Sequence, residues 1–222
     1  ADPPRIPGHE AAGHLDDGTP VGVHPDVGCG RCRHCQAGLE NRCPDKTAVG
    51  LDRDGGLADW LTVPAGHVVP LAGVDLGVAP LLEPLACCLH ALSCLGVRRG
   101  ETALVVGAGP MGLLSMWALQ AAGTTVAVAQ RSPERRWLAA SLGADAALTP
   151  DQDPAAELGE APSLAVVTAP GAEVIYSLPP WFGYEQLCRV RGTVEGRQID
   201  CLGQRGHSWG RPDWDRIALA RT

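Results

Sequence analysis

The chain has 222 residues, of which 45% are hydrophobic, and it carries a formal net charge of −7 at pH 7. This hydrophobic fraction is enough for a globular core, while the acidic balance and the lack of a basic stripe argue against a nucleic-acid partner. The nine cysteines are odd in number and cluster with metal-ligand spacing, which favours a reducing, cytoplasmic location and bound metal over a disulfide framework.

The first 80 residues predict a domain with many turns. They are rich in Gly, Pro and Asp, and only short apolar pieces interrupt them, with strands expected at 22–24 and 59–63. The composition then changes, and residues 81–95 predict a helix with Pro84 near its start. Because this helix is apolar over most of its surface, we expect it to be buried.

Four cysteines within fifteen residues form the most specific motif of the chain. They are Cys29, Cys32, Cys35 and Cys43, with the spacing C-x2-C-x2-C-x7-C. One such loop can close a tetrahedral zinc shell by itself, and a closed shell leaves no position for a substrate. We therefore predict a structural zinc, which can contribute on the order of 10 kcal/mol of folding free energy. The alternative, four unrelated buried cysteines, is disfavoured by the spacing.

Two residues near the ends of this domain have more than one interpretation. His9 lies in Gly8-His-Glu-Ala-Ala-Gly13, and a lone histidine is usually a structural residue. Glu83 opens the apolar helix, where a carboxylate needs a cation or a helix N-terminus. Metal binding and a structural role, which for Glu83 is capping of the first turn, both stay open.

Residues 102–168 alternate between short apolar strands and helices. Strands are expected at 102–106, 125–129, 146–148 and 164–168, and helices at 110–122 and from Ser132 to Gly143. This alternation predicts parallel strands joined by crossover helices. The most apolar run, 103–119, contains three glycines and Pro110, so it predicts no membrane span.

A glycine-rich turn follows the first of these strands and opens the first helix. The motif is G-x-G-x-x-G, made by Gly107, Gly109, Pro110, Met111 and Gly112. Glycines in this context allow a tight turn and the close approach of a pyrophosphate to the helix N-terminus. The turn therefore predicts dinucleotide binding, and the alternative is a glycine-rich turn without a ligand.

The end of the second strand bears on the choice between NAD and NADP. An acidic residue usually stands there and binds the ribose hydroxyls, but this chain has Gln130, followed by Arg131 and Arg135. A neutral amide followed by arginines suits a 2′-phosphate, which favours NADP over NAD. The alternative is that both arginines are solvated charges at the start of a helix.

The alternation stops after Pro170. Residues 188–195 and 198–202 predict the two arms of a hairpin, and 213–220 predicts a short helix. The tail from 181 faintly resembles lipocalin-like proteins related to carotenoid hydratases, on Arg191-Gly-Thr-Val-Glu-Gly196 and Gly203-Gln-Arg-Gly-His-Ser-Trp-Gly210. In that resemblance His207 is the candidate polar site residue.

Taken together, the motifs between about residues 3 and 170 resemble the zinc-containing medium-chain dehydrogenase/reductase superfamily, the alcohol and polyol dehydrogenases. The matching motifs, in the family's order, are Gly8-His9-Glu10, the four-cysteine lobe, Glu83-Pro-Leu-Ala and the glycine-rich turn. The resemblance implies a catalytic zinc held by His9, Glu10 and Glu83, which acts as a Lewis acid on a small alcohol or carbonyl substrate. It also implies hydride transfer to NADP or NAD.

The resemblance gives an α/β fold in three parts. Residues 1–80 are expected to form a partial GroES-like, β-rich catalytic domain with its zinc lobe. Residues 81–171 are expected to form an incomplete Rossmann parallel sheet that binds the dinucleotide, and residues 172–222 a hairpin-like tail of uncertain origin. The family usually forms dimers through late Rossmann strands that are not found in this chain, so the sequence does not fix the oligomeric state, and a homo-oligomer stays open.

Two departures from the family leave alternatives open. The family's first catalytic ligand, a cysteine, lies well before the Gly-His-Glu motif, whereas this chain begins eight residues before His9, so an N-terminally truncated copy is expected. The late Rossmann strands are also not found. The alternatives to an oxidoreductase are an inactive remnant that binds structural zinc and dinucleotide, and a tail-borne lipocalin-like hydratase or isomerase fragment.

Overall fold

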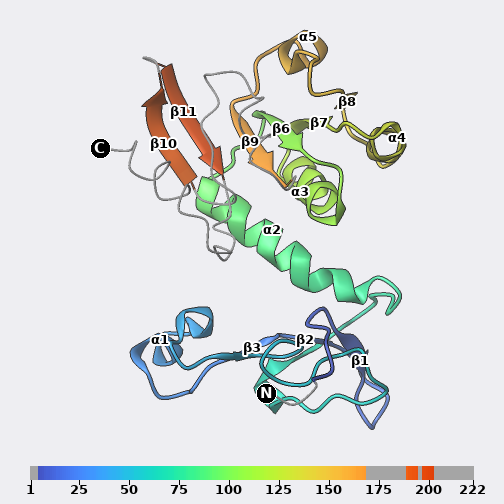
Figure 1. The fold of residues 1–222 in the computed structure, drawn as a ribbon, viewed down its shortest axis with the longest axis vertical. Coiled ribbons are helices and arrows are strands. Elements are labelled where there is room, and N and C mark those ends of the chain that lie inside the picture. The colour runs from blue at the N-terminus through green and yellow to red at the C-terminus, as the bar shows by residue number, and fades with distance from the viewer. Residues whose placement is uncertain (1–4, 169–188, 195–196, 203–222) are drawn as a thin grey trace. The chain divides into compact units, whose positions relative to one another are not determined.

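The structure is a computed structural model that describes residues 5–168, 189–194 and 197–202 (Figure 1). The chain divides into two compact units, Ala1–Ala86 and Cys87–Thr222. Within the described ranges, no helix combines the length and the hydrophobicity that crossing a membrane requires. The boundaries predicted at residues 80 and 171 stay predictions.

The first unit is built from short strands and turns. Its main sheet is antiparallel and has the order β1-β2-β5, made by Ala12–His14, Pro20–Val23 and Val68–Pro70. A second pair joins β3 (Asp26–Val27) to β4 (Thr47–Ala48). The remaining elements are single turns: α1 (Arg33–Gln36), η1 (Glu40–Arg42), η2 (Ala65–His67) and η3 (Ala79–Leu81). The zinc lobe is thus an excursion of the chain between β3 and β4.

The strand expected at 59–63 is wrong, and the strand that takes its place is β5. Residues 59–63 form no strand, and Trp60 within them is 82% exposed. The free edge of β2 is instead filled by Val68–Pro70, with Val23 opposite Val68 and Val21 opposite Pro70. The short apolar piece between turns at 59–63 therefore does not indicate a strand by itself, because the backbone groups of a strand also need a partner at a sheet edge.

The helix expected at 81–95 is confirmed as α2, Leu82–Leu95. Pro84 lies in its first turn, where the missing N–H removes no helical hydrogen bond. In the second unit, Ala91, Leu92 and Leu95 of this helix are buried in the core, whereas Leu89 is 51% exposed, so the expected burial holds for one face of the helix.

The second unit is a parallel sheet with helices on both faces. The strands β6 (Thr102–Val106), β7 (Thr125–Ala129), β8 (Ala146–Leu148) and β9 (Leu164–Val167) run parallel in the order β9-β6-β7-β8. They alternate with α3 (Pro110–Ala121), α4 (Pro133–Ser141) and α5 (Pro154–Leu158). The expected strands and helices are confirmed to within one or two residues, and α5 is an addition.

Alternation along the strands divides the core of this unit into two layers. Ala103 and Val105 of β6 pack in the cluster that includes buried residues of α2, α3 and α4. Leu104 and Val106 pack in the other cluster, to which Leu158 of α5 contributes. Because successive strand residues point to opposite faces, a fully apolar strand such as β6 requires cover on both. Each fully buried valine contributes roughly 1.5–3 kcal/mol.

The predicted hairpin is present as β10 (Arg189–Val194) and β11 (Arg197–Leu202), which pair antiparallel. Leu202 of β11 pairs with Val166, so the hairpin extends the sheet beyond β9 (Figure 1). The turn at 195–196, His207 and the helix expected at 213–220 lie outside the described residues.

Candidate functional site

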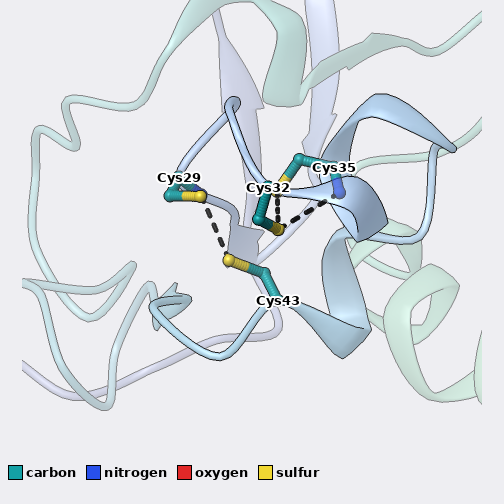
Figure 2. A group of neighbouring side chains, drawn as sticks. All are labelled: Cys29, Cys32, Cys35 and Cys43. Carbon is teal, nitrogen blue, oxygen red and sulfur yellow. Dashed lines mark hydrogen bonds between the residues drawn. The ribbon is translucent and has the colours of Figure 1, made fainter.

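The four cysteines of the lobe converge as their spacing predicts (Figure 2). Their sulfur atoms all lie within 4.8 Å of one another, and the Sγ atoms of Cys32 and Cys35 are 3.5 Å apart. A tetrahedral zinc with Zn–S bonds of about 2.3 Å places its sulfurs about 3.8 Å apart. The residues therefore fit a four-thiolate zinc without rearrangement of the loop.

Local structure brings these sulfurs together. Cys32 is the N-cap of α1, and its sulfur accepts a hydrogen bond from the Cys35 amide at 3.5 Å. The Cys43 sulfur accepts from the Cys29 amide at 3.4 Å. Gly28, directly before Cys29, has no room for a side chain, because a Cβ there would lie 2.6 Å from the Cys35 sulfur. Amide donors toward sulfur are the usual environment of metal thiolates and favour their charged form.

The lobe shifts the pKa values of two of its thiols in opposite directions. Hydrogen bonds from the Arg31 and Cys32 backbones lower the pKa of Cys29 to about 6. Desolvation, together with the neighbouring sulfurs of the lobe, raises the pKa of Cys35 to about 12. A group of thiols this close cannot all ionise without a cation, and a bound zinc ion supplies the charge that allows them to do so.

A second group of possible metal ligands forms within the first unit. One ligand atom each from His9, Glu10 and Glu83 lies within 4.8 Å of the other two. His9 and Glu83 are half-buried, whereas Glu10 is exposed. One imidazole nitrogen and two carboxylate oxygens are ligands that zinc accepts, and three protein ligands leave a coordination position open. The structure thus brings together the three residues that the sequence selected from distant positions.

Backbone contacts fix the segment that carries His9. Gly8 has φ of 106°, a conformation that favours glycine, and a Cβ there would lie 3.0 Å from Leu57. Its carbonyl oxygen accepts a hydrogen bond from the Gly56 amide at 2.8 Å, and the Pro7 carbonyl accepts one from the Leu57 amide at 3.1 Å. The loop around Gly56 therefore holds the Gly-His-Glu segment in place.

In the second unit, each glycine of the G-x-G-x-x-G turn has its own structural reason. Gly107 has φ of 107°, which lets the chain leave β6 in a tight turn. Gly109 is the N-cap of α3, and a Cβ there would have no atom within 4 Å. Gly112 packs so closely on the Gly107 carbonyl that a Cβ would overlap it. These are the requirements of a turn that receives a pyrophosphate: a sharp bend, open space and close helix–strand packing.

The position of this turn in the sheet supports the same function. The chain adds β7 and β8 on one side of β6 and then crosses over to place β9 on the other side. Ligands of such sheets bind where the strand order changes side, at the carboxyl ends of the strands. Pro110 and Met111 open α3 at this point, and the first-turn amides of a helix have no carbonyl partner within it. The turn thus offers N–H donors to an anion.

The end of β7 presents the residues that the sequence singled out for the ribose. The Gln130 Oε1 accepts a hydrogen bond from the Ser132 amide at 3.2 Å. Arg131 and Arg135 are exposed. Arg136, which the sequence did not single out, donates to the backbone carbonyls of Gln130 and Arg131 at 2.8 and 2.7 Å. The Arg136 guanidinium thereby stabilises the backbone between β7 and α4.

Thr168 is a second residue that the sequence did not single out. It follows β9, and its hydroxyl lies within 3.3 Å of the Gly107 carbonyl oxygen. In the sequence, only its position at the end of the fourth expected strand could have indicated a functional role for Thr168, because a single threonine forms no motif.

Comparison with known proteins also indicates a dehydrogenase-type chain. The family model of the alcohol dehydrogenase GroES-like domain matches residues 1–73. The chain is 38% identical over 143 residues to L-galactonate-5-dehydrogenase of Escherichia coli K12, an alignment that covers 60% of this chain and 42% of the relative. The chain therefore spans less than half the length of this relative.

Two solved structures are similar to this one. A proposed zinc-binding dehydrogenase from Sinorhizobium meliloti 1021, bound to NADP, is 32% identical with a TM-score of 0.70, covering 78% of this chain and 57% of the other. A short chain alcohol dehydrogenase from Escherichia coli CFT073, complexed with NADH, is 30% identical with a TM-score of 0.68, covering 80% and 59%. With the cysteine lobe and the glycine-rich turn, these similarities support the zinc-containing medium-chain dehydrogenase/reductase superfamily as the family of this chain.

Proposed function

We propose that this chain supplies the metal site and the dinucleotide site of an alcohol dehydrogenase-type oxidoreductase. The reaction would transfer a hydride between an alcohol or carbonyl substrate and NADP or NAD. The observation that carries this proposal is the convergence of His9, Glu10 and Glu83, whose ligand atoms lie within 4.8 Å of one another. A structural role for each residue alone does not require all three to meet.

The residues of the first unit would hold the catalytic metal. A zinc ion bound by His9, Glu10 and Glu83 supplies Lewis acidity toward a substrate oxygen. The imidazole of His9 and the half-buried carboxylate of Glu83 are held by the Gly8 turn and the first turn of α2. Glu10 is exposed and would be the most solvent-accessible of the three residues that would hold the metal.

The residues of the second unit would hold the dinucleotide. The open space at Gly109 and the amides that open α3 suit a pyrophosphate. At the ribose, the neutral Gln130 does not repel a 2′-phosphate, and the exposed Arg131 and Arg135 can pair with it. We therefore expect NADP to bind more tightly than NAD. The similar structures are described with NADP in one case and NADH in the other.

The substrate class is an alcohol that carries several hydroxyl groups. The support for this is the name of the curated relative, an L-galactonate-5-dehydrogenase, whose substrate is a sugar acid. A second relative, 36% identical over 161 residues, is a D-altritol 5-dehydrogenase from Agrobacterium fabrum.

Turnover by the zinc-loaded chain tests the proposal directly. The chain is incubated with NADP or NAD and a panel of simple alcohols, polyols and sugar acids, and formation of the reduced nicotinamide is followed by absorbance. Metal analysis accompanies the assay, and about two zinc ions per chain are expected if both sites are loaded. In the Glu83→Gln variant, we expect about one zinc ion and no turnover, while dinucleotide binding persists.

Binding without chemistry would contradict the proposal. A chain that takes up one zinc ion and NADP but oxidises none of the panel would be the non-catalytic remnant that the sequence leaves open. The matched control is Cys43→Ser, which removes a ligand of the lobe and leaves His9, Glu10 and Glu83 intact. If that variant and Glu83→Gln lost the same metal ion, the second site would not exist.

A further inference from the structure

Thr168 connects the end of β9 to the glycine-rich turn. Its backbone amide donates to the Val106 carbonyl at 2.9 Å, which continues the pairing of β9 with β6. Its hydroxyl oxygen lies 3.2 Å from the same Val106 oxygen and 3.3 Å from the Gly107 oxygen. One hydroxyl proton is therefore shared between two consecutive carbonyls at the point where β6 becomes the turn.

The Gly107 carbonyl is enclosed from two sides. Gly112 of α3 packs against it without room for a Cβ, and the same imagined Cβ would lie 2.9 Å from the Thr168 hydroxyl oxygen. The end of β6, the first turn of α3 and the end of β9 thus meet around this one carbonyl. Thr168 supplies the hydrogen bond at that junction, since glycine has no side chain to give one.

Holding this carbonyl has a consequence on the other side of the peptide. The peptide bonds of the described residues are trans, and in a trans peptide the C=O and N–H groups point in opposite directions. A fixed Gly107 carbonyl therefore fixes the direction of the Ala108 N–H. Gly107 itself has φ of 107° and great conformational freedom, so the order must come from its neighbours.

We propose that Thr168 is a positioning residue for the dinucleotide, which it orders by holding the Gly107 carbonyl and with it the amides of the glycine-rich turn. The inference rests on the proposed function, because it assumes that a dinucleotide pyrophosphate binds at this turn. Thr168 acts through the backbone and contacts no reacting atom, so it is not a catalytic residue. Amides that are already ordered bind an anion more tightly because less freedom is lost on binding.

The chain contains a matched control at the opposite end of the same strand pair. The Ser163 amide donates to the Thr102 carbonyl at 2.9 Å, and its hydroxyl lies 3.1 Å from the same oxygen. Ser163 therefore makes the same kind of bond between β9 and β6, far from the glycine-rich turn. Loss of either hydroxyl removes one side-chain hydrogen bond to the sheet, but only Thr168 reaches Gly107.

The test compares Thr168→Val, Thr168→Ser and Ser163→Ala in the full chain. Dissociation constants for NADP and NAD are measured by titration, and melting temperatures are measured without ligand. We expect Thr168→Val to weaken dinucleotide binding about fivefold to tenfold, the equivalent of one side-chain hydrogen bond. Thr168→Ser should restore parental affinity, and Ser163→Ala should lower the melting temperature comparably without changing affinity.

Each other result overturns the inference in a recognisable way. Equal affinity of the parent and Thr168→Val would show that the hydroxyl does not order the turn. Equal losses in Thr168→Val and Ser163→Ala would reduce the effect to general destabilisation of the sheet. If the parent chain bound neither NADP nor NAD, the proposed function itself would fail, and the inference with it.

Discussion

Gly109 and Gly112 are three residues apart and are glycines for opposite reasons. A side chain at Gly109 would point into open space, with no atom within 4 Å, whereas one at Gly112 would overlap the Gly107 carbonyl. Gly109 also has an ordinary φ of −83°, so its backbone does not require glycine. The open space at Gly109 would accommodate the proposed dinucleotide, whereas the crowding at Gly112 is a requirement of the fold.

This difference predicts that alanine at the two positions has separable effects. Gly109→Ala should leave the melting temperature nearly unchanged and weaken NADP binding, because its methyl group occupies the pyrophosphate space. Gly112→Ala should destabilise the second unit by about 1–3 kcal/mol, the usual cost of overpacking. Thermal melts and NADP titrations of both variants measure this. Unchanged NADP affinity in Gly109→Ala would mean that nothing binds there.

The unequal pKa values in the cysteine lobe predict an order of reactivity in the zinc-free chain. Because the pKa of Cys29 is lowered to about 6, most of it is thiolate at pH 7, and the thiolate is the nucleophile. The rate of its alkylation should fall as the pH is lowered through about 6. Cys35, with its pKa raised to about 12, should be the slowest of the four.

Peptide mapping after brief treatment with iodoacetamide at several pH values measures this order. Added zinc should protect all four cysteines together, since they share one site. Equal rates at Cys29 and Cys35 would contradict the backbone hydrogen bonds at Cys29 as the cause of the difference.

Site residues differ in how visible they are in the sequence. The lobe cysteines and Gly107, Gly109 and Gly112 were predictable because fixed spacing reflects fixed local geometry. His9 and Glu83 became interpretable only together, since they are distant in sequence and meet through the fold. Thr168 and Arg136 were missed, because a residue that acts on the backbone of another segment leaves no local pattern.

At the scale of elements, the lobe between β3 and β4 has few stabilising contacts apart from those that its proposed zinc would supply. Of its four cysteines only Cys43 is buried, and neither α1 nor η1 contains a buried residue. Lys46 and Asp26 form an ion pair of 2.8 Å at its base, and partly exposed pairs of this kind contribute at most about 1 kcal/mol. The order of the lobe should therefore depend on zinc.

Removal of zinc by a chelator should unfold the lobe locally. Amide hydrogen exchange is expected to rise strongly across residues 28–43 and to stay unchanged in β6 and β7, whose cores contain no metal ligand. Mass spectrometry of peptides from both regions measures this. Protection of the lobe that survives complete zinc removal would show that its hydrogen bonds are sufficient.

The elements also show where sequence patterns stop being informative. The strands of the second unit were predictable because their apolar runs are buried on both faces. In the first unit, 59–63 is a short apolar piece between turns, yet β5 pairs with β2 instead. That choice depends on which segment reaches the sheet edge. The helix α5 has clear signals, Asp153 as N-cap and a left-handed Gly159, but at five residues it was too short to show periodicity.

At the scale of the molecule, the proposed metal sites and the proposed dinucleotide site belong to different compact units. The cysteine lobe and the group of His9, Glu10 and Glu83 lie within Ala1–Ala86, and the glycine-rich turn lies within Cys87–Thr222. Each unit therefore has its own proposed ligands, and the two core clusters of buried residues lie in the second unit. A ligand stabilises the folded form that it binds by mass action.

This division predicts that zinc and NADP stabilise different parts of the chain. NADP at about one hundred times its dissociation constant should stabilise the second unit by about 2.7 kcal/mol and leave the first unit unaffected. Zinc should do the reverse. Hydrogen exchange of β2 and β6 peptides through a thermal ramp, with each ligand alone and with both, separates the two effects. If NADP protected β2 as strongly as β6, the two units would unfold as one, and ligand binding in one would be coupled to order in the other.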